Sequence, residues 1–207
     1  MPLQSKGPVW HQKYKKKGII PKGLRGIDKV ATWGYCKAKG WIYGHGTFSL
    51  TSYETPILGI FQWMKNSAHE AKRMEWEVGK LANIIKKIFM DSKADSQRIY
   101  SHLKKDFKIQ LIVKPRKYNH TSKTRQKMIQ EMWTKRNRKE FRKRSTTVEP
   151  MQSLVKDIFE LERCWMRGDD NNKWLFAAMG IAVQMSQWKA YREKRSTWNI
   201  KSDVLGV

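Results

Sequence analysis

Two acidic residues lie where carboxylates could carry out chemistry. Asp91 ends a short apolar run that starts at Lys87 and is predicted to be a buried strand, and open α/β sheets carry functional groups at the carboxyl ends of their strands. Glu149 begins a predicted helix that runs to about Glu162. Carboxylates that converge from a strand end and a helix can hold Mg²⁺ or Mn²⁺, and paired metal ions promote phosphodiester cleavage and transfer. Asp91 and Glu149 therefore predict a metal-dependent phosphoryl-transfer site.

Each acid also has a structural interpretation when it is taken alone. Asp91 could cap the helix that follows its strand, because strand-to-helix turns often use Asp. The helix from Glu149 could be an ordinary amphipathic helix, with Glu149 and Lys156 on its polar side. Its predicted core face consists of apolar residues at helical spacing, namely Met151, Leu154, Val155 and Ile158.

The charge of the chain indicates a polyanionic partner. The sequence has 43 Lys and Arg against 18 Asp and Glu, a formal net charge of +25. Such an excess repels itself in a compact state, and nucleic acid is the leading partner because bound phosphates offset it. Basic segments at 1–40 and 114–144 flank the candidate acids. A merely solubilising basic surface is the alternative interpretation.

Several other function classes lack their motifs. The only cysteines are Cys36 and Cys164, so neither a disulfide framework nor a cysteine zinc site is indicated. No phosphate-binding glycine loop follows a strand, no Gly-x-Ser-x-Gly occurs, and the five histidines show no ligand spacing. The longest apolar stretch, 174–191, carries too many polar residues for a membrane helix, and the beginning of the chain is basic without an apolar signal. We expect a cytoplasmic, nucleoid-associated protein without a membrane partner.

The predicted elements form an α/β fold with a helical C-terminus. A basic loop-rich arm over 1–40 with little regular structure precedes one domain over 41–207. Strands are expected over 41–50, 56–64, 87–91 and 108–113, and helices over 66–85, 96–107 and 149–162. A helix crosses between the last two strands, so these should be parallel. Three tryptophans at helical spacing are expected in the core rather than stacked on bases: Trp165, Trp174 and Trp188.

One motif resembles a known family. Phe141, Arg144, Glu149 and Lys156 resemble the Tyr, Arg, Glu and Lys signature of bacterial insertion-sequence DDE transposases of the insertion-sequence-four type. Phe replaces Tyr, and the gap between Arg144 and Glu149 is one residue longer than in the family. The segment 86–95 is similar to the family's second-aspartate strand and following turn. The resemblance extends over roughly residues 41–190.

The resemblance implies a fold, a cofactor and roles for residues. It implies an RNase H-like mixed sheet flanked by helices and a Mg²⁺-dependent triad with Asp91 second and Glu149 third. Arg144 and Lys156, with Arg142 and Lys143, would contact double-stranded DNA at transposon ends and in target DNA, where the family acts as a homodimer.

The match to the family is incomplete at the first acid of the triad. Asp28 is the only acid in the first 53 residues, and no apolar strand precedes it. We expect the opening strand and its aspartate to lie upstream of Met1, with Asp28 as the alternative first ligand. A non-enzymatic basic DNA- or RNA-binding module and an RNA-processing nuclease of similar fold remain alternatives.

Overall fold

The chain folds as two compact units. The computed structural model describes residues 2–36, 39–117 and 122–206. The first unit combines residues 1–68 with 147–207, and the second unit spans 69–146. The fold is mixed α/β, with 46% helix and 19% strand. The predicted α/β class is therefore confirmed.

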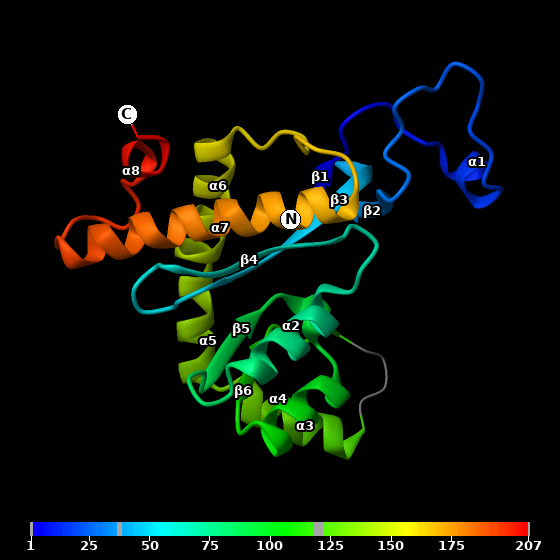
Figure 1. Ribbon diagram of the computed structural model, residues 1–207. Helices are drawn as coiled ribbons and strands as arrows, with labels where there is room; N and C mark the ends of the chain where they lie inside the picture. Colours follow the sequence, from blue (N-terminus) through cyan, green and yellow to red (C-terminus); the bar gives the residue numbers. More distant parts are fainter. Residues whose placement is uncertain (1, 37–38, 118–121, 207) are drawn as a thin grey trace. The chain divides into compact units, whose positions relative to one another are not determined.

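The first unit is built on a four-stranded antiparallel sheet with β3 paired to each of the other strands (Figure 1). Gly44 lets β1 approach β3, because a Cβ at this position would lie 1.9 Å from the Leu3 carbonyl oxygen. The strands are β1 (Pro2–Gln4), β2 (Thr32–Cys36), β3 (Gly40–Thr51) and β4 (Leu58–Lys65).

Helices cover this sheet and close its core. α7 lies along β4 (Figure 1), and Gly180 allows close contact with Phe61. The Gln187 side chain is fully buried and accepts a 2.8 Å hydrogen bond from the Leu58 amide. Apolar residues of α6 and α7, including Val155 and Phe176, complete the core. The helices of this unit are α1 (Gln12–Lys16), α6 (Val148–Phe159), α7 (Asp169–Arg192) and α8 (Lys201–Leu205).

The second unit contains the predicted parallel pair of strands. β5 (Lys87–Met90) pairs in parallel with β6 (Gln110–Val113), and α3 (Gln97–Asp106) connects them, which confirms this prediction. Ile99 and Leu103 of α3 are buried, as their spacing predicts. The remaining elements are α2 (Glu70–Lys80), η1 (Ser92–Ala94), α4 (Lys123–Met132), α5 (Lys135–Arg142) and η2 (Lys143–Thr146).

Residues 1–40 have more regular structure than the sequence predicts. β1 and β2 both lie in this range and pair with β3, and Leu3, Trp10 and Ala31 are buried. Most of residues 2–36 lies in loops and turns, as predicted, but β1 and β2 belong to the same sheet as β3, which the sequence does not predict. Strands of three and five residues show too little periodicity to be recognised, and their pairing with β3 stabilises them.

The prediction for three tryptophans in the C-terminal part of the chain also needs correction. Trp165, Trp174 and Trp188 are exposed, Trp174 to 79%, so the prediction that they belong to the core is wrong. α7 carries apolar residues on nearly every side, and its sequence does not distinguish the side that packs on β4. Within the described residues, no helix is long and apolar enough to cross a membrane.

Candidate functional site

Asp91 occupies the position that the sequence predicts. It follows directly after β5, and its Oδ1 accepts a 2.8 Å hydrogen bond from the Lys93 amide at the start of η1. The geometry of Asp91 therefore fits both the functional and the structural interpretation, because the residue follows the end of a strand and its side chain caps the next turn. A carboxylate that caps through one oxygen still has a second oxygen to offer a cation.

Glu149 lies in the first turn of α6 and is exposed. Lys156 follows seven residues later, which returns it to nearly the same side of the helix. The opposite side is buried through Met151, Val155 and Ile158, as predicted. Asp91 belongs to the second unit and Glu149 to the first, and each acid is placed within its own unit.

The other predicted DNA-binding residues lie just before α6 in the chain. Arg142 ends α5, and Lys143 and Arg144 belong to η2. The Arg144 guanidinium lies 5.5 Å from the centre of the Phe141 ring, which in turn packs edge-on against Trp133. This contact orients Arg144 through an aromatic ring, and it involves the two residues that carry the family resemblance on this segment.

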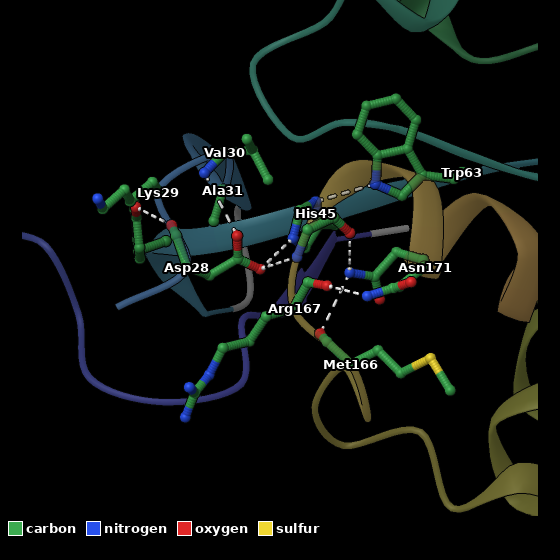
Figure 2. Close-up of polar contacts among 12 residues, drawn as sticks. Asp28, Lys29, Val30, Ala31, His45, Trp63, Met166, Arg167 and Asn171 are labelled. Carbon is green, nitrogen blue, oxygen red and sulfur yellow. Dashed lines mark hydrogen bonds and ion pairs between the residues drawn. The ribbon is translucent and has the colours of Figure 1, made fainter. Parts of the chain in front are cut away.

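Asp28 is buried inside the first unit at the start of a chain of polar side chains (Figure 2). The residue is 2% exposed, and its Oδ2 lies 2.8 Å from His45 Nε2. The Trp63 indole N–H donates a 2.9 Å hydrogen bond to His45 Nδ1. An indole nitrogen is only a donor, so Nδ1 is the acceptor and the His45 proton is on Nε2, directed at Asp28.

Two backbone amides also donate hydrogen bonds to the Asp28 carboxylate. The Gly168 amide donates to Oδ2 and the Val30 amide to Oδ1, each at 3.3 Å. Burial by itself raises the pKa of Asp28, but the hydrogen bond from His45 and these two amides outweigh it, and the pKa lies below its ordinary value. The geometry therefore makes Asp28 a structural anion in which both carboxylate oxygens accept hydrogen bonds.

Two of the predicted metal ligands carry carboxylates outside this buried chain, and each lies in its own unit. Asp91 and Glu149 supply hard carboxylate oxygens of the kind that Mg²⁺ and Mn²⁺ prefer. Asp28, the alternative first ligand, is engaged by His45. Across residues 2–36, 39–117 and 122–206, no group of three or more His, Cys, Asp or Glu is arranged to hold a metal ion.

The sequence does not predict the hydrogen-bonded chain of Asp28, His45 and Trp63. His45 lies between two glycines on β3, and the sequence predicts only a strand for this segment. The available signal was an ionisable residue in the middle of an apolar strand, because such a group is buried only with a partner. Comparison with family models, curated proteins and solved structures finds no match to this chain. The residues of the chain itself therefore carry the functional argument.

Proposed function

We propose that this chain is part of the catalytic region of an insertion-sequence-type DDE transposase and cleaves and transfers DNA strands with the help of divalent metal ions. The observation that carries the proposal is the polar side of α6, where Glu149 and Lys156 lie together above a buried apolar side. The spacing of this acid and this cation matches the Glu and Lys of the family's signature, and Arg144 precedes them with a gap one residue longer than in the family.

An RNase H-like fold, which has a mixed sheet, is part of the proposal. Both kinds of strand pairing are present in the chain, in two separate sheets. The first unit has antiparallel pairs around β3, and the second unit has β5 and β6 in parallel with α3 between them. In such a fold, Asp91 at the end of β5 would be an active-site acid, because α/β sheets carry functional groups at the carboxyl ends of their strands.

Asp91 and Glu149 would hold the metal ions. Bound Mg²⁺ or Mn²⁺ would supply Lewis-acid stabilisation of the phosphodiester oxygens. Arg142, Lys143, Arg144 and Lys156 would bind the phosphate backbone on either side and keep the strand in position. The net charge of +25 favours this binding over a wide surface.

A non-enzymatic basic DNA- or RNA-binding module is the second candidate. The engagement of Asp28 by His45 favours it, because a third carboxylate is then missing from the proposed metal set. This candidate predicts that Asp91→Asn and Glu149→Gln leave DNA affinity unchanged or raise it. The transposase proposal instead predicts that each substitution weakens Mn²⁺ binding.

The test combines two titrations of the purified chain. In the first, Mn²⁺ binding to the DNA-bound protein is followed by electron paramagnetic resonance for the wild type, Asp91→Asn, Glu149→Gln and the control Asp157→Asn, an exposed acid on the same helix. Mn²⁺ binding that is equal in all four proteins contradicts the proposed ligands.

The second titration measures duplex affinity against salt concentration. Arg144→Ala and Lys156→Ala should each reduce the slope of log affinity against log salt by about 0.9, whereas the exposed control Lys22→Ala should not. An RNA duplex in parallel separates the RNA-nuclease alternative, because a stronger preference for RNA contradicts a DNA transposase.

A further inference from the structure

A buried acid, Asp95, ends the turn that begins with Asp91 in the second unit. The turn consists of Asp91, the short helix η1 and Asp95, and it connects β5 with α3. The Asp95 side chain is 0% exposed, whereas Asp91 is half-buried. A carboxylate is buried to this extent only with partners, because an ion pair or hydrogen bonds must offset its lost hydration. The partners of Asp95 therefore show what this residue holds in place.

Two other segments of the second unit bind the same oxygen of Asp95. The amide of Arg116, which lies shortly after β6, donates a 2.6 Å hydrogen bond to Oδ2. The Arg125 guanidinium, on α4, forms an ion pair with this oxygen, and the Arg125 side chain is only 9% exposed. The buried carboxylate thus joins the turn after β5 to the segment after β6 and to α4.

Arg125 is supported by the helix on which it lies. Ser122 caps α4 and accepts a 3.2 Å hydrogen bond from the Arg125 amide. Met128 and Met132 of the same helix are buried, and Met128 Sδ lies 3.7 Å from an Arg125 guanidinium nitrogen. The helix packs on β6 and α3. The cation that pairs with Asp95 therefore belongs to a packed helix.

The bonds of Asp91 lie within the turn that Asp95 anchors. The Asp91 carbonyl oxygen accepts a 3.1 Å hydrogen bond from the Ala94 amide, and Oδ1 accepts one of 2.8 Å from the Lys93 amide. Within the described residues, Asp95 is the one member of the turn whose side chain bonds to another segment. A shift of Asp95 would therefore move the amides to which Asp91 is bonded.

We propose that Asp95 is a positioning residue for Asp91. Its bonds to Arg125 and to the Arg116 amide hold the turn after β5, so that Oδ2 of Asp91 stays in place for a metal ion. Replacement of residues that orient a metal ligand commonly costs about 10–100-fold in metal affinity. The inference rests on the proposed function for the metal ion, whereas the hold on the turn is a property of the fold.

Electron paramagnetic resonance of Mn²⁺ with the DNA-bound protein measures the effect on the metal. Asp95→Asn keeps the shape of the side chain but removes the charge that pairs with Arg125, so it should weaken Mn²⁺ binding by at least about tenfold. Arg125→Lys keeps the cation and should retain more affinity than Arg125→Met, which leaves a buried carboxylate unpaired. If Asp95→Asn does not fold, the double substitution Asp95→Asn with Arg125→Gln leaves no unpaired charge and should weaken Mn²⁺ binding in the same direction.

Hydrogen exchange measured by NMR separates positioning from general stability. In Asp95→Asn the Lys93 and Ala94 amides should exchange at least about tenfold faster, because the turn loses a charge-assisted bond. The comparison is the amide of Leu111, a buried residue of β6. A hold on the turn predicts that the increase at Lys93 and Ala94 exceeds the increase at Leu111.

Two variants of the same unit serve as matched controls. Leu103 is fully buried in α3, so Leu103→Ala lowers the stability of the unit without altering the turn. Glu131→Gln removes an ion pair with Lys104 that joins α4, the helix of Arg125, to α3. Neither variant should change the Mn²⁺ affinity of the folded protein or raise exchange selectively in the turn.

Two results overturn the inference. One is Mn²⁺ binding that is lost in Asp91→Asn but unchanged in Asp95→Asn. The other is exchange in Asp95→Asn that rises equally in the turn and at Leu111, because the ion pair then stabilises the unit as a whole. Mn²⁺ binding that is unchanged in Asp91→Asn instead rejects the proposed function, and the exchange comparison then decides by itself whether Asp95 holds the turn.

Discussion

Replacement of Asp28 by Asn tests the buried polar chain of the first unit. Asn keeps the shape of Asp but replaces one acceptor oxygen by an NH₂ donor. Because Trp63 donates to His45 Nδ1, His45 must donate from Nε2 and cannot change its tautomer to accept from Asn. The remaining oxygen of Asn can satisfy either His45 and Gly168 or Val30, but not all three donors.

The better of these two arrangements sets the size of the effect. If the oxygen faces His45 and Gly168, the NH₂ group meets the Val30 amide donor, and a partly buried amide loses its acceptor. The two retained bonds also lose their charge assistance. An unsatisfied donor of this kind costs about 1–3 kcal/mol, so we expect Asp28→Asn to lower the free energy of unfolding by about 2 kcal/mol. Asp157→Asn, an exposed matched substitution, should change it by less than about 0.5 kcal/mol.

The dependence on pH has a definite sign. The pKa of Asp28 is lowered in the folded protein, so its charged form stabilises the fold above the unfolded pKa. This contribution is lost as the pH falls through the lower, folded-state pKa. The difference between wild type and Asp28→Asn should therefore be constant from neutral pH down to about pH 5 and shrink below about pH 4.

Urea unfolding followed by tryptophan fluorescence measures these differences. Eight of the ten tryptophans lie in the first unit, and only Trp76 and Trp133 lie in the second. The signal therefore reports mainly on the unit that contains Asp28. Equal stability of Asp28→Asn and wild type, or a difference that grows in acid, would refute the assigned hydrogen bonds.

Three further predictions concern the same unit. Gly44→Ala should destabilise the fold by about 3 kcal/mol or more in thermal unfolding, because the new Cβ would collide with the Leu3 carbonyl, whereas Gly59→Ala meets only an ordinary contact and should be mild. Gln187→Leu should cost about 2–3 kcal/mol in urea unfolding, since it leaves the buried Leu58 amide and Thr197 carbonyl without their partner; an effect as small as that of Gln184→Leu would contradict this role. Burial raises the pKa of the Cys164 thiol to about 12, so a thiol reagent at pH 8 should leave Cys164 unmodified until the protein is unfolded, as peptide mass mapping would show.

The local elements could be predicted from the sequence. α3 was recognised because Ile99 and Leu103 lie four residues apart, and the parallel pairing of β5 with β6 followed from the helix between them. Asp91 was placed at a strand end because an apolar run stops there. Each of these inferences depends on residues that are close together in the chain.

The missed features depend on residues that are distant in the chain. β1 owes its structure to β3, about 40 residues later, and the sequence of three residues gives no signal of its own. Asp28 meets His45, Trp63 and Gly168 only after the sheet and the start of α7 have formed. The side of α7 that faces β4 is also decided by packing, since both sides are apolar.

Metal-dependent nicking of supercoiled plasmid DNA tests the central claim most directly. The assay compares the wild type with Asp91→Asn, Glu149→Gln and the exposed controls Asp157→Asn and Asp106→Asn, in Mg²⁺ and in Mn²⁺. We predict nicking by the wild type and both controls and its loss in Asp91→Asn and Glu149→Gln. Nicking that persists in both of these variants, or a wild-type chain that binds DNA but cuts it with neither metal, would contradict the proposed metal-dependent cleavage.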